Sequence, residues 1–408
     1  MTGLRVYDTA RRGLMPLPTS RTSSSRTFKL YVCGITPYDS GHIGHAFTYC
    51  AFDVLVRWVE ASGVRVRYVQ NVTDVDDPLF VRARRDRIRW RDLARRETAE
   101  FRRDMSRLGW RQPDVMPHAS TEIPVILRAI RRLDRRGYSY ATDALYFEVE
   151  KDPRFGELSR LSHPAMMRAL HQRGLAGKVG PDARHNPLDF QLWRSSEPGE
   201  PTWPSPYGAG RPGWHIQCSA MAMEHLGYPI DVHGAGRDLV FPHHESERAQ
   251  SEALTGRAPF ARAWMHTGMV RYQGAKMSKS LGNLVLVRQA LEKASPAGLR
   301  LYLASHRYRR DWGFSWEGLA AAASLADAIG AAVGASRSQR DPDAGRDAPA
   351  LDRDLWADFK AAMDDDLDTP RAIRVLRRAL LERRPAAVRR MAGILCGRAS
   401  YRRSPASP

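Results

Sequence analysis

Hydrophobic runs and helical spacing divide the first part of the chain into a strand, a helix and a second strand. Residues 29–35 form a nearly continuous apolar run, which is typical of a buried strand. Residues 43–62 carry apolar side chains near helical spacing, and residues 64–72 predict the next strand. A strand, a helix and a strand in this order predict a βαβ unit and therefore a parallel sheet.

The pattern changes between about residue 84 and residue 190, where it is mostly helical and rich in arginine, with one strand-like stretch at residues 144–149. We interpret this segment as an insertion into the sheet domain. Strand patterns return after it, at residues 229–233, 239–241 and 264–270. The expected fold class is therefore α/β, with a Rossmann-like parallel sheet that is divided by a helical insertion.

The pattern is helical again from about residue 295 to the end, apart from a polar stretch at residues 336–349 that contains Pro and Gly. We expect a catalytic domain over residues 1–295 and a stem-like helical connection over residues 296–335. Residues 336–349 then form a linker, and residues 350–408 form a C-terminal α-helical bundle.

Composition excludes several classes of protein. The 408 residues are 43% hydrophobic and 27% charged, which is ordinary for a globular protein. No unbroken apolar run reaches 18 residues, and the first residues lack the apolar core of a signal peptide. The four cysteines form no CxxC pair, which is typical of a reduced compartment. We therefore expect a cytoplasmic protein without a membrane segment.

The net charge of +19 invites a nucleic-acid interpretation, because basic side chains neutralise phosphates. Only seven of the 64 basic residues are lysines, however, and the arginines are spread widely along the chain. A solvated surface produced by codon bias is the alternative, and both interpretations stay open.

Two histidines mark the start of the first predicted helix. His42 and His45 fall in its first turn, where free backbone N–H groups and the positive end of the helix dipole favour an anion. Gly44 between them leaves room for a nucleotide. The alternative is a pair of capping or core histidines.

A second candidate segment is Lys276-Met-Ser-Lys279-Ser, which holds two of the seven lysines. Lysine is a flexible point charge that suits a triphosphate, although a solvated charged loop is the alternative. HIGH (residues 42–45) followed by KMSKS (residues 276–280) resembles the signature of the class I aminoacyl-tRNA synthetases. The resemblance implies that His42, His45, Lys276 and Lys279 stabilise the phosphates of ATP during activation of a carboxylate.

A third candidate is a metal site made of residues far apart in the sequence. Cys33 ends the first strand, Cys218 lies in the segment WHIQC, and His243 and Glu247 lie four residues apart. His243 and Glu247 share a face if a helix begins at Pro242. Two thiolates and an imidazole can bind zinc and leave a coordination position open. By spacing alone, two buried core cysteines and an unrelated histidine pair are the favoured interpretation.

A wider resemblance changes that balance. The chain is similar to two related families, the cysteinyl-tRNA synthetases and the ligases that join cysteine to glucosaminyl-inositol in mycothiol biosynthesis. The motifs that carry the resemblance are YVCGITPYD (31–39), HIGHA (42–46), NVTDVDDP (71–78), GEPTWPSPYGAGRPGWHIQCSA (199–220), FPHHE (241–245) and KMSKS (276–280). It implies that one Zn²⁺ is bound by Cys33, Cys218 and His243, with Glu247 as an additional candidate ligand, and that this zinc binds the thiolate of L-cysteine. Zinc would separate cysteine from serine, because a hydroxyl is a poorer ligand that stays protonated.

The resemblance also implies which residues line a cysteinyl-adenylate formed from cysteine and ATP with Mg²⁺. They are Thr48, Asn71, Val72, Thr73, Trp214, Gly236, Arg237, Asp238 and Val270.

The acceptor of the cysteinyl group stays open between the two families. GITPYD (34–39), His45 and YRRDW (308–312) resemble the ligases, and the chain after residue 362 is too short for a full anticodon-binding domain. NPLDF (186–190) and Glu247 resemble the synthetases, and the ERGGDP-like motif of the ligases is absent around residues 173–185. We expect the amine of glucosaminyl-inositol as acceptor. A compact synthetase that charges tRNA(Cys) is the alternative, and a non-catalytic paralogue that binds RNA or a partner is the third interpretation.

Overall fold

The computed structural model describes residues 3–18, 27–38, 41–177, 179–180, 183–277, 282–335 and 348–397. Lys279 and most of the expected linker lie outside these ranges.

Four parallel strands form the central sheet, in the spatial order β10-β9-β3-β4. The strands are β3 (Thr27–Ile35), β4 (Arg65–Val72), β9 (Ile230–Gly236) and β10 (Ala261–Thr267). Helix α1 (Ile43–Ala61) connects β3 to β4. The predicted βαβ unit and the α/β fold class are confirmed.

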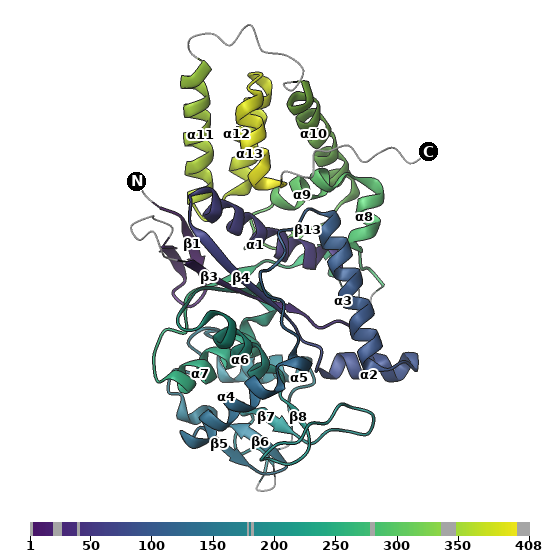
Figure 1. Ribbon diagram of the computed structural model, residues 1–408, viewed down its shortest axis with the longest axis vertical. Helices are drawn as coiled ribbons and strands as arrows, with labels where there is room; N and C mark the ends of the chain where they lie inside the picture. The colour runs from purple at the N-terminus through teal and green to yellow at the C-terminus, as the bar shows by residue number, and fades with distance from the viewer. Residues whose placement is uncertain are drawn as a thin grey trace.

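Helices cover both faces of the sheet (Figure 1). Helix α1 lies on the face towards the C-terminal helices, whereas α6 (Trp214–Leu226) and α7 (Glu245–Thr255) lie on the opposite face with the insertion. The core on the α1 side continues into the C-terminal helices. The core on the other side joins β3 and β9 to α6.

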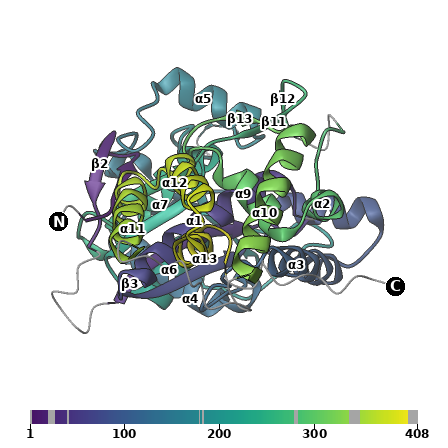
Figure 2. The ribbon, with the colours of Figure 1, turned by 90° about the horizontal axis from the view of Figure 1, so that it is seen from above.

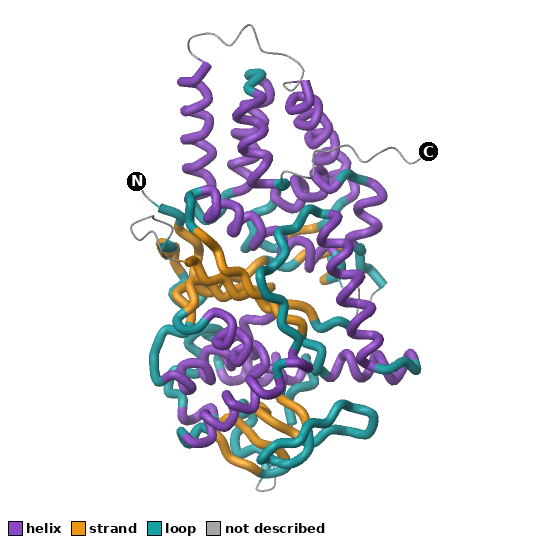
Figure 3. Tube along the Cα trace, viewed as in Figure 1, coloured by secondary structure: helices purple, strands orange, loops and turns teal. Residues whose placement is uncertain are grey.

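The segment between β4 and α6 is helical in part and also holds a second sheet, which Figure 3 shows apart from the central one. Its helices are α2 (Asp77–Asp86), α3 (Trp90–Arg107), α4 (Ile123–Arg135) and α5 (His163–Gln172). Its antiparallel strands are β5 (Ser139–Ala141), β6 (Ala144–Phe147), β7 (Phe190–Arg194) and β8 (Arg211–Pro212). The sequence predicted only β6, from the stretch 144–149, and missed β5, β7 and β8, which have three, five and two residues.

One expected strand is wrong. Residues 239–241 belong to helical turns, Arg237–Leu239 and Val240–His244, in which Phe241 alone is extended. A run of three apolar residues cannot distinguish a strand from a buried turn. The expected strand at 264–270 is two strands, β10 and β11 (Val270–Tyr272), separated at Gly268 and Met269.

The remaining elements complete the two ends of the chain. An N-terminal hairpin of β1 (Arg5–Asp8) and β2 (Gly13–Pro16) packs against β10. After β12 (Ala275–Lys276) come α8 (Val287–Lys293), α9 (Pro296–Ala304), β13 (Trp312–Gly313), α10 (Trp316–Ala335), α11 (Ala348–Asp364), α12 (Thr369–Leu381) and α13 (Pro385–Leu395). Figure 2 shows α10 to α13 gathered over α1 and α9.

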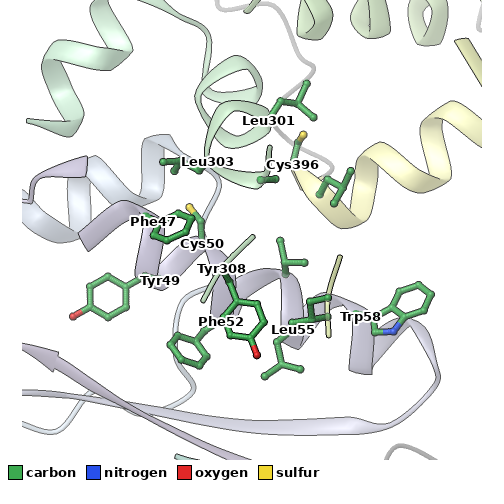
Figure 4. Close-up of a cluster of buried hydrophobic side chains, with 14 of the residues drawn as sticks. Phe47, Tyr49, Cys50, Phe52, Leu55, Trp58, Leu301, Leu303, Tyr308 and Cys396 are labelled. Carbon is green, nitrogen blue, oxygen red and sulfur yellow. The ribbon is translucent and has the colours of Figure 1, made fainter. Parts of the chain in front are cut away.

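Side chains of α1 join the sheet domain to the C-terminal helices. Phe47 and Cys50 lie on the side of α1 that faces Leu303 of α9 (Figure 4). Phe52 points the other way, towards the sheet, where a Cβ at Gly234 of β9 would lie 2.2 Å from its ring. Helix α1 therefore starts at His42, and its middle packs between the sheet and the C-terminal helices.

Helix α10 has the length and composition of a membrane-spanning helix, with a mean hydropathy of 1.2 over Trp316–Gly334. Its buried residues, Leu319, Ala322, Ala326 and Ile329, recur at helical spacing, and the helix packs against α9 and α13. This packing is typical of a bundle helix with one face on the core, so α10 alone is weak evidence for a membrane segment.

Candidate functional site

Four potential metal ligands from three elements and a turn meet beneath the ends of the central strands. Cys33 lies near the end of β3, Cys218 lies on α6, and His243 and Glu247 lie on the turn and the helix that follow β9. The donor atoms of these four buried side chains all lie within 4.8 Å of one another. A parallel sheet collects functional groups at the carboxyl ends of its strands, which explains how residues so far apart in the sequence meet.

Contacts within the cluster orient its imidazole. His243 Nε2 lies 2.8 Å from Glu247 Oε1, and the Cys33 thiol lies 3.5 Å from the same oxygen. On the other side of the ring, His243 Nδ1 lies 2.9 Å from His215 Nδ1. The Trp214 ring stacks on the His243 ring with centroids 4.4 Å apart. A hydrogen bond to the second nitrogen fixes the ring of a metal-binding histidine, and His215 is placed to provide it.

Three further histidines, His233, His244 and His266, lie next to the cluster. His233 Nε2 lies 2.6 Å from Glu247 Oε2, and His266 Nε2 lies 2.8 Å from His244 Nδ1. Cys33, His233, His244 and Glu247 form another set of donors within 4.8 Å of one another. His244 Nε2 is buried and has no hydrogen-bond partner among the described residues.

Sequence reasoning missed His215, His233 and His266. A signal was present, because six of the 13 histidines lie between residues 215 and 266. Their roles could not be assigned without knowing that β9, α6 and β10 bring them together.

Electrostatics in the cluster favour a bound cation. Burial raises the pKa of Cys33 well above its usual value, and the contacts with Cys218 and Glu247 raise it further. Burial opposes the charge on Glu247, but His233 and His243 outweigh it and hold the pKa of Glu247 well below its usual value. Burial likewise disfavours a charged His243, yet Glu247 and Cys218 raise the pKa of His243 to about 10. These pKa shifts pair an ionised Glu247 with a protonated His243, and a metal ion bound there would supply that positive charge in place of the proton.

This donor set fits a metal ion. Two sulfurs, an imidazole nitrogen and a carboxylate oxygen are ligands of the kind found in zinc sites. The buried cluster could therefore hold a metal through Cys33, Cys218, His243 and Glu247.

The two histidines of HIGH lie at the start of α1. His42 is the N-cap residue, and its Nδ1 accepts a hydrogen bond of 3.0 Å from Gly44 N. The His42 and His45 rings stack with centroids 3.9 Å apart. A Cβ at Gly44 would lie 2.8 Å from His42 Cε1, so a larger residue would displace this ring.

The next turn of α1 contacts the strand that carries Cys33 and the end of β10. Tyr49 donates a hydrogen bond of 3.4 Å to the Cys33 carbonyl oxygen, and Thr48 Oγ1 lies 2.7 Å from Thr267 Oγ1. A Cβ at Gly236 would lie 4.0 Å from Thr48 Oγ1 and 2.7 Å from Asp238 Oδ1. Thr48, Gly236 and Asp238 are therefore neighbours.

Asn71 and Thr73 hold the backbone after Cys33. Asn71 Oδ1 accepts a hydrogen bond of 2.9 Å from Gly34 N, and Asn71 Nδ2 donates one of 2.9 Å to Thr73 Oγ1. A Cβ at Gly34 would lie 1.6 Å from the Asn71 carbonyl oxygen, so only glycine is tolerated there.

The remaining predicted residues are buried, paired with another residue, or outside the described part of the chain. The Val72 and Val270 side chains are buried, so neither presents an open side chain to a ligand. Arg237 forms an ion pair of 3.0 Å with Asp311. Lys276 pairs through its backbone with Arg271, but its side chain and the whole of Lys279 lie outside the described part of the chain.

Comparison with known proteins assigns the class. The family model described as tRNA synthetases class I (C) catalytic domain matches residues 19–324. Methionyl-tRNA synthetase of Mycobacterium tuberculosis, bound to methionyl-adenylate, has a similar structure, with a TM-score of 0.65, 15% identity and 92% of both chains covered. A LeuRS–tRNA–LeuAMS complex of Agrobacterium radiobacter gives a TM-score of 0.68 at 12% identity, covering 93% of this chain and 85% of that one. At these identities the structures show the shared fold.

Sequence relatives define the group within the class. Proteins named "L-cysteine:1D-myo-inositol 2-amino-2-deoxy-alpha-D-glucopyranoside ligase" are similar over most of their length. That of Frankia alni is 48% identical over 86% of this chain and 82% of its own, and that of Acidothermus cellulolyticus is 46% identical over 91% and 88%. The chain belongs to the class I tRNA synthetase (C) catalytic-domain family and, within it, to these ligases.

Proposed function

We propose that this protein activates L-cysteine with ATP and transfers it to the amine of 1D-myo-inositol 2-amino-2-deoxy-alpha-D-glucopyranoside, or glucosaminyl-inositol. The observation that carries the proposal is the buried cluster of Cys33, Cys218, His243 and Glu247 beside the HIGH turn. A substrate thiol suits such a cluster, and the relatives' names contain both substrates.

The proposed reaction has two steps. A cysteine carboxylate oxygen forms a bond to the α-phosphorus of ATP, and the bond to the β-phosphate breaks to release pyrophosphate. The amine nitrogen of the sugar then forms a bond to the carbonyl carbon of cysteinyl-adenylate. The mixed anhydride bond breaks, its electron pair leaves with AMP, and the amine loses one proton to solvent.

The chain's own residues divide this work. Zn²⁺, when bound by Cys33, Cys218 and His243 with Glu247 as a further ligand, supplies Lewis acidity towards the substrate thiol. His215 fixes the orientation of the His243 ring. Thr48, Gly236 and Asp238 are placed to line the adenylate between this cluster and the start of α1.

His42, His45, Lys276 and Lys279 are proposed to stabilise the phosphates of ATP, which enters with Mg²⁺. The stacked imidazoles at the start of α1 lie where the helix terminus favours an anion. Lys276 lies on β12, and Lys279 follows it within three residues. We also propose that the enzyme works in the cytoplasm, where its thiols stay reduced.

We predict that Lys279→Ala slows cysteine-dependent ATP–pyrophosphate exchange on the order of 10²-fold, because one stabilising charge on the phosphates is lost. Zinc content and thermal stability should not change. Lys151→Ala is the control, since Lys151 is an exposed lysine of the insertion. Equal exchange rates in the two variants would remove Lys279 from the mechanism.

The experiment that tests activation is the same exchange assay on the unmodified enzyme with cysteine or serine. Exchange with cysteine and almost none with serine supports the proposal. Absence of exchange with both amino acids would contradict it and leave a non-catalytic paralogue as the interpretation.

Transfer to tRNA(Cys) is a second candidate, favoured by the net charge of +19. The adenylate would be the same, but a terminal hydroxyl of the tRNA would attack it and form an ester. The two acceptors are separated by their products.

A further inference from the structure

A large cavity opens beside the candidate site, and its wall includes Arg237, Asp238 and His266 of that site. Its volume is about 850 Å³. Its wall comes from six parts of the chain: the β1–β2 hairpin, the loop before α5, the end of α5, the turns after β9, His266 of β10 and the loop before β13.

The cavity lies next to the residues expected to bind the adenylate and near the cluster of candidate metal ligands. Arg237 and Asp238, which the resemblance places on the adenylate, belong to its wall. His266 also belongs to the wall, and its ring bridges Thr9 Oγ1 at 2.7 Å and His244 Nδ1 at 2.8 Å. The cavity wall is thus connected to the donor cluster through His266 and His244.

The wall is rich in hydrogen-bond donors. Its charged residues are Arg12, Arg173, Arg237, Arg309, Arg310, Asp238 and Asp311. Guanidinium groups donate several hydrogen bonds in a fixed geometry, and the two carboxylates accept them. Donors and acceptors mixed in this way suit a ligand with many hydroxyl groups.

Aromatic surface for a nucleobase is scarce in the wall. Tyr7 is covered by the Arg309 guanidinium, 4.7 Å from the ring centroid. Phe241 is only 7% exposed. Single-stranded nucleic acid is usually bound by stacking its bases on open aromatic faces, so the wall favours a polyol over the end of a tRNA.

We propose that this cavity binds the acceptor, a polyol that carries an amino group. The inference rests on the proposed function and names the place where the acceptor of that reaction binds. Arg310 and Gln172, two wall residues that are not among the residues assigned to the adenylate, hold its hydroxyl groups. Both side chains are exposed in the cavity wall, and Arg310 has no ion pair among the described residues. Gln172 directly precedes the stretch 173–185, where the chain departs from the pattern of the ligases.

The test is Arg310→Ala and, separately, Gln172→Ala, assayed for both half-reactions. We predict that Arg310→Ala raises the KM for glucosaminyl-inositol about tenfold or more, since a charged hydrogen bond is lost. Gln172→Ala raises it less, because its lost hydrogen bond is neutral. The KM of ATP in pyrophosphate exchange should change much less than the KM of the acceptor. Arg374→Ala is the matched control, because Arg374 is an exposed arginine on α12 outside the cavity wall.

Each other outcome overturns the proposal in a distinct way. Equal increases in the KM of ATP and of the acceptor would assign the cavity to the nucleotide. An unchanged acceptor KM in both variants would place the acceptor elsewhere. An unmodified enzyme that forms no amide would contradict the proposed function itself, and the acceptor pocket with it.

Discussion

Replacing Cys218 by alanine should remove the bound zinc and abolish cysteine activation together. Cys218 is 1% exposed and lies among Cys33, His243 and Glu247. Its loss would remove one of the two sulfurs of the proposed zinc site and, with the zinc, the positive charge proposed to lie beside Glu247. Mutating a residue that only hydrogen-bonds to a metal ligand typically lowers metal affinity or activity about 10- to 100-fold. Loss of a ligand itself should therefore lower the rate of cysteine activation on the order of 10²-fold or more.

The measurement is zinc per chain together with pyrophosphate exchange. Cys396→Ala is the matched control, because Cys396 is also a fully buried cysteine but lies in the C-terminal core. That variant should keep its zinc and its exchange activity, although it too removes a buried thiol. A folded Cys218→Ala variant with full zinc content and full exchange would refute the metal site.

Replacing Asp53 by alanine should lower the free energy of unfolding by about 3–5 kcal/mol, because the buried Arg300 charge then lacks a partner. Asp53 on α1 and Arg300 on α9 form an ion pair in which both side chains are fully buried. Asp53 also accepts hydrogen bonds from Arg57 Nε at 3.0 Å and from Arg111 N at 3.0 Å. Arg300 donates to the Leu395 carbonyl oxygen at 3.2 Å, so the pair ties α1 to the end of α13.

Denaturant unfolding measures this effect. The control is Asp358→Ala, which removes an exposed ion pair with Arg378 in the C-terminal helices and should cost below about 1 kcal/mol. The double variant Asp53→Leu with Arg300→Met should recover part of the loss, because no unpaired Arg300 charge is then buried, although Arg57 and the Arg111 N–H still lose their acceptor. A cost below about 1 kcal/mol for Asp53→Ala would show that the pair does not hold the bundle on α1.

Local pattern predicted the first βαβ unit closely. The strand expected at 29–35 is observed at Thr27–Ile35, and the helix expected at 43–62 is observed at Ile43–Ala61. These elements are long and strongly apolar, and their pattern is independent of the rest of the chain. The insertion's sheet was missed because its short strands are defined by pairing between distant residues rather than by their own periodicity.

Prediction of the candidate site likewise required knowledge of the sheet topology. Cys33 and Glu247 are 214 residues apart, and their contact exists only because β3 and β9 are neighbours. Spacing alone therefore favoured unrelated core cysteines, and only the family motifs predicted the cluster. His215 and His266 carry no local signature, because each acts through another histidine.

The central claim is that cysteine is joined to a sugar amine, and a direct product assay tests it. Purified enzyme, ATP and cysteine are incubated with glucosaminyl-inositol in one sample and with tRNA(Cys) in another. The account predicts the cysteinyl amide, with one AMP and one pyrophosphate per product, in the first sample and no charged tRNA in the second. Charged tRNA without any amide would contradict it and identify a compact cysteinyl-tRNA synthetase.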